Sequence, residues 1–165
     1  MKILRLATAI IFGLTAAVPA LAAKEKVAVA HFDFKDTSGE VRNQTEFHTA
    51  SIKELQATLV QALDKTGRFD AVPLTCKTPP CSVDNLDAAT FTNAAKKDGA
   101  TLVVFGGVHK ISTLITFGRI AMVNVDTGKS LLDRALTFRG DDKDAWQHAD
   151  AYMANMVLSA LPGGK

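Results

Sequence analysis

The residues with the greatest capacity for chemistry lie in one short segment, residues 33–40. The segment supplies carboxylates from Asp33, Asp36 and Glu40 and hydroxyls from Thr37 and Ser38. Oxygen ligands of this kind suit Ca²⁺, and in open α/β sheets ligands collect beyond the carboxyl ends of strands. The spacing differs from that of an EF-hand loop, which needs a denser alternation and a central glycine. The segment is therefore a candidate ligand- or cation-binding loop. The simpler interpretation is a solvated turn in which Asp36 or Ser38 caps nearby backbone groups.

A second small set of residues is the pair His31 and Asp33, two positions apart on an expected strand. Such a pair could ligate a metal or orient an imidazole. One histidine and one carboxylate fall short of a zinc site unless a further ligand such as His109 arrives from elsewhere. A hydrogen-bonded histidine at the polar end of a sheet is the favoured interpretation. His48 and His148 lie on expected helices and are predicted to be solvated.

Sequence signatures of catalysis are missing. The chain has neither the Gly-x-Ser-x-Gly motif of a nucleophile elbow nor a phosphate-binding loop, and Gly106-Gly107 alone is too little for a nucleotide fingerprint. These glycines, like Gly118, are expected to permit close packing or a bend in a strand. The sequence therefore predicts a protein that is not an enzyme and uses no cofactor.

Acidic residues also crowd the start of the last expected helix, at Asp141, Asp142 and Asp144. Capping and the helix dipole explain such residues without a ligand. Trp146 follows one turn later. It could belong to the core or to a contact surface, and the core is favoured.

The elements that position these residues follow from apolar periodicity. The patterns predict strands at residues 26–34, 68–74, 101–109, 114–125 and 130–138, and helices at 45–65, 86–97 and 142–161. Asp84 or Asn85 is the expected N-cap of the second helix. On the first strand, alternation places Val27, Val29, His31 and Asp33 on one face and Ala28, Ala30, Phe32 and Phe34 on the other.

The element order is β-α-β-α-β-β-β-α. The first half permits a parallel crossover, and the second half is an antiparallel meander. The predicted fold class is α/β with α+β character: one mixed sheet with helices packed on it.

The chain opens with the pattern of an export signal. Lys2 and Arg5 precede an apolar stretch, and a small-x-small cleavage pattern ends at Ala22. The apolar run is short for a bilayer span, which disfavours the alternative of an uncleaved membrane anchor. We therefore expect a signal peptide at residues 1–22 and a single domain at 23–165. That domain would be periplasmic or secreted, without stable membrane insertion.

Charge argues against nucleic acid as a partner. Lys2 and Arg5 account for the whole formal net charge of +2, so the expected mature chain is neutral. A general nucleic-acid binder needs a concentrated positive surface. No basic run here exceeds two residues.

Cys76 and Cys81 are the two cysteines of the chain and flank a proline-containing loop. In an oxidising compartment such a pair most often forms a disulfide. A redox pair would more typically be Cys-x-x-Cys at a helix start, and a zinc site would need two further ligands nearby. A structural disulfide is therefore predicted.

Several stretches carry a family resemblance: residues 27–34 with 36–40, 67–69, 99–112 and 125–129, and Arg139-Gly140 with Trp146. In this order they resemble a family of exported bacterial proteins of unknown function. Its members are distantly similar to the amino-terminal domain of TolB and to the core of the curli secretion lipoprotein CsgG. The resemblance implies a TolB-N-like domain that contacts other envelope proteins and does not catalyse a reaction. The alternative is a periplasmic ligand- or cation-binding protein that uses the loop from Asp33 to Glu40.

Overall fold

A computed structural model describes residues 23–161; the predicted signal peptide and the four C-terminal residues lie outside this range. The elements are β1 (Glu25–Val29), β2 (Asp33–Asp36), α1 (Thr45–Lys65), β3 (Phe69–Pro73), α2 (Ala88–Lys97), β4 (Leu102–Lys110), β5 (Ile115–Asn124), β6 (Ser130–Arg139) and α3 (Lys143–Ala160). No helix within this range is long and apolar enough to cross a membrane.

One mixed sheet organises the domain. Its strand order is β3-β1-β4-β5-β6, and β2 also pairs with β4. The β1, β2, β3 and β4 pairings are parallel, whereas β4, β5 and β6 form an antiparallel meander. This arrangement confirms the predicted fold class.

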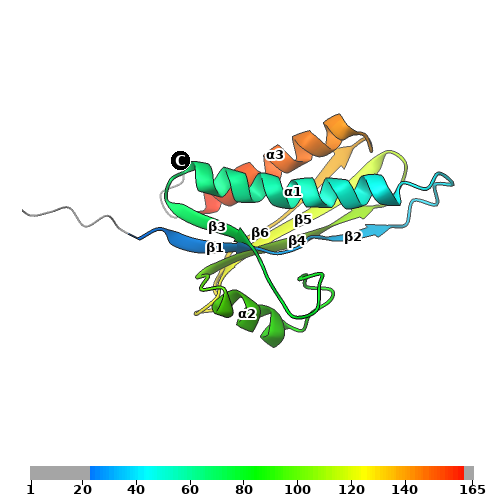
Figure 1. The fold of residues 1–165 in the computed structure, drawn as a ribbon. Coiled ribbons are helices and arrows are strands. Elements are labelled where there is room, and N and C mark those ends of the chain that lie inside the picture. Colours follow the sequence, from blue (N-terminus) through cyan, green and yellow to red (C-terminus); the bar gives the residue numbers. More distant parts are fainter. Residues whose placement is uncertain (1–22, 162–165) are drawn as a thin grey trace, which may run out of the picture.

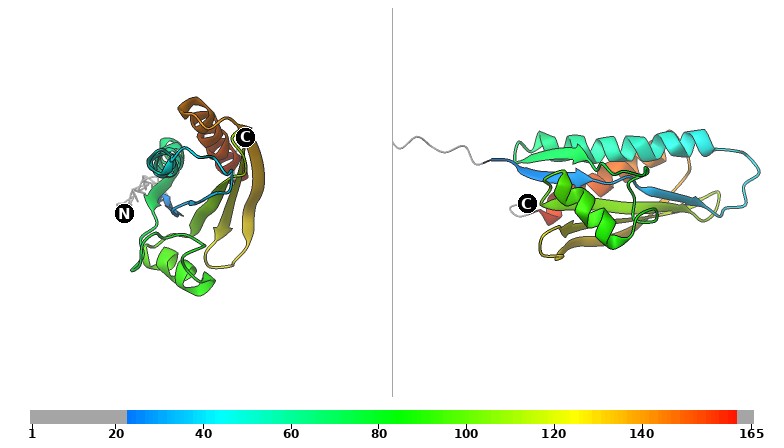
Figure 2. Two further views of the ribbon diagram at one scale, coloured as in Figure 1. Left: turned by 90° about the vertical axis from the view of Figure 1, so that its right-hand side faces the viewer. Right: turned by 60° about the horizontal axis from the view of Figure 1, so that its bottom comes forward.

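The helices form unequal layers on the two faces of the sheet. α1 and α3 lie side by side over one face, and α2 lies on the other (Figure 1). Residues Ile52, Leu55, Leu59 and Leu63 of α1 are buried against the first face at helical spacing. The core under α2 is smaller and includes Phe91 and Ala95. Figure 2 shows that α2 lies near one side of the curved sheet and that β5 and β6 extend beyond α2.

The predicted first strand is interrupted. Three residues lie between Val29 and Asp33, whereas the residues they pair with on β4, Val104 and Gly107, enclose two. The additional residue makes a bulge between β1 and β2. The prediction of one continuous strand at 26–34 is therefore wrong.

This bulge reverses the facing of every later side chain on the strand, because side chains alternate with a period of two. Phe32 and Phe34 join Val27 and Val29 in the core under α1 and α3, while Ala30 lies in the core under α2. The predicted face assignment is wrong from the bulge onward.

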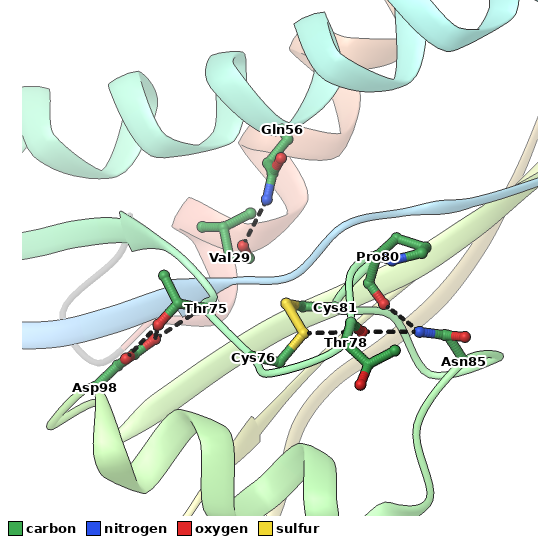
Figure 3. The surroundings of a disulfide bond; sticks show 9 residues. All are labelled: Val29, Gln56, Thr75, Cys76, Thr78, Pro80, Cys81, Asn85 and Asp98. Carbon is green, nitrogen blue, oxygen red and sulfur yellow. Dashed lines mark hydrogen bonds between the residues drawn. A yellow bond between two sulfur atoms is a disulfide. The ribbon is translucent and has the colours of Figure 1, made fainter.

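Two neighbouring segments supply the hydrogen bonds that the bulge needs. The N–H of His31 donates to the carbonyl of Cys81 at 3.0 Å. The carbonyl of Val29 accepts the N–H of Leu74 at 2.8 Å. It also accepts the side-chain amide of Gln56 on α1 at 2.8 Å (Figure 3). Buried backbone groups must find such partners, so the bulge depends on the cysteine loop and on α1.

Cys76 and Cys81 form a disulfide, as predicted. Within their loop, the side-chain amide of Asn85 donates to the carbonyls of Thr78 and Pro80 (Figure 3). The crosslink and these hydrogen bonds fix the loop whose Cys81 carbonyl serves the bulge.

The helix starts differ in part from expectation. α2 begins at Ala88, where the side chain of Asp87 accepts the N–H groups of Ala89 and Thr90. The prediction of Asp84 or Asn85 as its N-cap is therefore wrong. Asp142 caps α3 as expected.

Gly106 and Gly118 permit close packing, as the sequence predicted. A Cβ at Gly106 would lie 2.0 Å from the Arg119 carbonyl oxygen and 2.8 Å from the Phe32 ring. At Gly118 the nearest atom is the flexible end of Met153, at 2.6 Å.

We expect Gly106→Ala to lower the free energy of unfolding by about 3 kcal/mol or more, the upper end of what overpacking costs. The reason is that a carbonyl group within a strand cannot move alone. Gly118→Ala is the matched control and should cost less, since side chains can turn away. Urea denaturation of both variants measures the difference. Equal losses would contradict this account.

Candidate functional site

The predicted loop residues are directed at separate partners. Asp33 Oδ2 accepts the N–H of Asp84 at 3.2 Å, beside the disulfide loop. Asp36 Oδ1 accepts the N–H of Ser38 at 2.8 Å. Slight burial opposes ionisation of Asp36, but the hydrogen bonds from Ser38 outweigh it and lower the pKa of Asp36. Asp36 therefore forms the local turn that the simpler interpretation describes.

Two other loop residues reach the end of β4. Thr37 Oγ1 is hydrogen bonded to Nε2 of His109 at 2.7 Å. Glu40 Oε2 accepts a hydrogen bond from Lys110 at 2.6 Å. Ser38 Oγ accepts the N–H of Glu40. Across residues 23–161, no group of three or more His, Cys, Asp or Glu side chains is placed to hold a metal ion.

The bulge also separates His31 from Asp33. His31 lines a cavity of about 390 Å³ beside α1, together with His48. Asp33 lines a groove that runs along β4 and β5. The two side chains therefore do not form the pair that strand alternation suggested.

A buried lysine is the centre of the polar structure at this end of the sheet. Lys110 ends β4 and is 0 % exposed. Its Nζ donates to Glu40 Oε2, to Gln44 Oε1 at 2.7 Å and to Asp141 Oδ2 at 2.5 Å. We call Lys110, Glu40, Gln44, Asp141 and His48 the Lys110 cluster.

Asp141 connects this lysine to α1 and α3. His48 Nε2 lies 2.9 Å from Asp141 Oδ1, and the indole N–H of Trp146 donates to the same oxygen at 3.1 Å. Burial opposes ionisation of Asp141, but hydrogen bonds from Lys110, Trp146 and His48 outweigh it and lower the pKa of Asp141. Asp141 is therefore a charged, buried crosslink, a role that sequence reasoning missed when it explained this aspartate by capping and the helix dipole.

Aromatic rings enclose the Lys110 cluster. The ring centroids of Phe34 and His48 are 4.4 Å apart, and Phe138 packs against Trp146 at 5.6 Å. Trp146 is buried, which confirms its expected place in the core. His48 is also buried, so the prediction that it is solvated is wrong.

The sequence carries a signal for the burial of Lys110. Val104, Gly106 and Val108 alternate on the helix-covered face of β4, and Lys110 continues the same alternation. A lysine in that register must be buried and paired.

The Lys110 cluster is suited to bracing and not to amine chemistry. Burial disfavours the charged form of Lys110, but hydrogen bonds from it to Asp141 and Glu40 prevail and raise its pKa. A nucleophilic lysine needs a lowered pKa and a free lone pair. Lys110 has neither.

A second buried acid lies between the two helices. Asp150 of α3 is 3 % exposed, and its Oδ1 has no hydrogen-bond partner among the described residues. Burial, with a smaller contribution from the charge of Glu54 on α1, raises the pKa of Asp150 to about 7.

Exposed apolar side chains gather beyond the Lys110 cluster. They belong to the β4–β5 turn and the start of β5 and to the loop before α1: Ile111, Leu114, Ile115, Phe117 and Val41. Leu114 is 69 % exposed. A hydrogen bond between the Thr37 hydroxyl and His109, and one from the Thr37 N–H to the carbonyl of Lys110, hold the loop against the strand. We call these five residues the apolar end; Figure 1 shows this end of the sheet on the side away from residue 23.

The sheet face that α2 leaves uncovered carries a groove of about 590 Å³. Its lining includes Val83, Phe105, Phe117 and Val123. Arg119 and Asp133 cross it as an exposed ion pair, at 2.7 Å. Phe117 of the apolar end also lines this groove.

The chain belongs to the DUF3280 family, because the family model, described as a protein of unknown function (DUF2380), matches residues 25–158. No curated protein matches. This membership supports the resemblance inferred from the sequence.

Solved structures share the fold at low identity. TolB from Acinetobacter baumannii is 17 % identical with a TM-score of 0.54, and the match covers 86 % of this chain but 29 % of TolB. A PelC dodecamer from Paraburkholderia phytofirmans is 16 % identical with a TM-score of 0.53, covering 88 % of this chain and 94 % of PelC. A hypothetical protein, CT253, from Chlamydia trachomatis is 9 % identical with a TM-score of 0.50, covering 83 % and 99 %.

We expect Lys110→Met to lower the free energy of unfolding by about 3–5 kcal/mol at pH 7, because the buried Asp141 carboxylate loses its main cation. Lys35→Met, at an exposed position on β2, is the matched control and should change stability by about 0.5 kcal/mol or less. Chemical denaturation compares the two variants. A Lys110→Met loss no larger than that of the control would contradict the bracing role.

Asp150 should make the domain less stable as the pH rises. The folded-state pKa of Asp150 is above the ordinary 3.8. The favourable contribution of neutral Asp150 to the free energy of unfolding is therefore fully present below about pH 4 and is lost as the pH rises to about 7. At pH 8, Asp150→Asn should therefore raise the free energy of unfolding by up to about 4 kcal/mol, and the gain should shrink toward pH 4.

Thermal melts from pH 4 to pH 8 test this expectation. Asp144→Asn, at an exposed acid on the same helix, is the control for removing one negative charge from α3. A pH-independent effect of Asp150→Asn would rule out the assigned shift.

Proposed function

We propose that this DUF3280 domain is a non-catalytic interaction or accessory domain that contacts other proteins of the bacterial envelope. The observation that carries the proposal is the apolar end, where large side chains are presented to solvent on a rigid support. A group of exposed large apolar side chains at one end of a domain is typical of a protein contact site.

The Lys110 cluster explains how such a surface stays rigid. Lys110 immediately precedes Ile111, and Glu40 immediately precedes Val41. The 2.6 Å bond between Lys110 and Glu40 therefore anchors both segments that present apolar side chains. A contact site held in one conformation loses less entropy on binding.

The shared fold supports an envelope role. TolB from Acinetobacter baumannii contains a domain of this architecture, which agrees with the TolB-like sequence resemblance and the envelope contacts that it implies. PelC, which shares the fold, was solved as a dodecamer. The pattern of residues 1–22 and the Cys76–Cys81 disulfide both suit an exported protein, periplasmic or secreted after cleavage.

The alternative function is binding of a ligand or cation by Asp33, Asp36, Thr37, Ser38 and Glu40. It would require Glu40 to leave Lys110, and it would require Asp33 and Asp36 to turn from the Asp84 and Ser38 N–H groups. The interaction function needs no such rearrangement and is preferred.

Site-directed crosslinking tests the interaction function. A photo-crosslinking amino acid at position 114 should capture a defined envelope protein in cells, whereas the same group at the exposed Lys96 of α2 should not. Leu114→Glu should remove the partner from affinity-purified protein, because a buried charge opposes docking.

Val83→Glu is the matched control, since Val83 is also an exposed apolar residue but lies in the groove near the disulfide loop. Retention of the partner by Val83→Glu and loss by Leu114→Glu would support the apolar end as the contact. Identical partner recovery from Leu114→Glu and wild type would exclude it.

A further inference from the structure

The two edges of the sheet differ in how well they are protected. The edge strand β3 has five residues and ends at Pro73, which cannot donate to a further strand. The edge strand β6 has ten residues and contains neither proline nor glycine. A long, regular edge strand is a template for pairing with another chain.

The backbone groups that β6 leaves unpaired can be assigned from its register. The N–H of Gly140, just after β6, donates to the carbonyl of Leu114 beside β5. Because backbone groups alternate along a strand, Phe138, Leu136 and Arg134 also face β5. The backbone N–H and C=O groups of the alternate residues therefore point outward: Asp133, Ala135, Thr137 and Arg139. The described part of the chain offers these groups no backbone partner.

We propose that β6 pairs antiparallel with β6 of a second copy of this chain, with Leu136 opposite Leu136 on the two-fold axis. Such an isologous contact closes on itself and extends both sheets into one. In this register Ala135 lies opposite Thr137 of the second copy, and both residues have outward backbone groups. Each copy's free donors and acceptors thereby meet free partners.

Charge complementarity selects this register. Asp133 and Arg139 lie on the same face of β6. In a pairing centred on Leu136, Asp133 of each copy lies opposite Arg139 of the other copy, so two pairs of opposite charge form. A pairing centred on Ala135 would set Asp133 opposite Thr137. A pairing centred on Arg134 would place two arginines opposite each other, which is unfavourable.

The face of the sheet that α3 covers offers room beside β6 for a strand of the second copy. A groove of about 670 Å³ runs along β6 and α3, lined on the helix by residues that include Tyr152, Asn155 and Met156. In the proposed register Phe138 of the second copy lies opposite Arg134, at this groove. A phenyl ring beside a guanidinium is a favourable contact there. The exposed Tyr152 would be covered by the second copy.

Cysteine pairing tests the register directly. Opposed strand residues have Cα atoms close enough for a disulfide, about 5.5 Å apart. A mixture of full-length Ala135→Cys and Thr137→Cys chains should therefore oxidise to a dimer that contains one of each, as intact mass will show. Either variant alone should give little dimer. Efficient dimer formation by Ala135→Cys alone would overturn the proposed register.

Sedimentation equilibrium of the mature protein tests self-association itself. Wild type should dimerise, and Arg139→Glu, which faces Asp133 of the second copy, should raise the dissociation constant roughly tenfold. Lys96→Glu makes the same charge change on α2 and should leave the constant unchanged. Ala135→Pro removes an outward N–H and should abolish dimerisation while a thermal melt still shows a folded domain.

Wild-type protein that remains monomeric up to millimolar concentration would overturn the proposal. So would a dimer that is equally sensitive to Lys96→Glu and Arg139→Glu. The dimerisation experiments are independent of the apolar end, because Leu114 lies outside the proposed contact. Leu114→Glu should therefore leave the dimer intact.

Discussion

One additional residue in the first strand determines much of this domain. Because β4 has two residues where the first strand has three, Phe32 and Phe34 turn toward the helices instead of away from them. The Arg119 carbonyl oxygen and the Phe32 ring then occupy the space that a side chain at Gly106 would need. The bulge also leaves the His31 N–H to donate to the carbonyl of Cys81 instead of to a neighbouring strand. The bulge therefore connects the disulfide loop, the glycine and the aromatic core.

The bulge also supplies the environment of the Lys110 cluster. Phe34 packs on His48, and His48 contacts Asp141, so the buried ion pairs are surrounded by rings on the helix side. Buried charges are tolerated only when each is paired, and here every charged group of the cluster has a partner. The same pairing holds the loop before α1, the end of β4 and the start of α3 together.

The sequence was sufficient for features that depend on local pattern. The mixed sheet, the bounds of α1, the disulfide and the buried Trp146 all follow from periodicity, spacing or composition. It failed where tertiary pairing decides. A bulge leaves no mark in the alternation of Ala30, His31 and Phe32, since all three suit either core. For the candidate site, residue types predicted that the loop carboxylates could share a ligand. Pairing across 70 positions, which sends Glu40 to Lys110, cannot be read from a local motif.

The separation of these partners along the chain gives the domain an order of assembly. Glu40, Gln44 and His48 emerge early in a chain made or translocated from its N-terminus, Lys110 much later, and Asp141 only after the last strand. His48 and Asp141 are 93 positions apart. Until Asp141 arrives, Lys110 lacks one of its counter-charges and α1 has no α3 to pack beside. The end of the sheet that presents the exposed apolar side chains therefore gains its full set of buried ion pairs only after Asp141 has emerged.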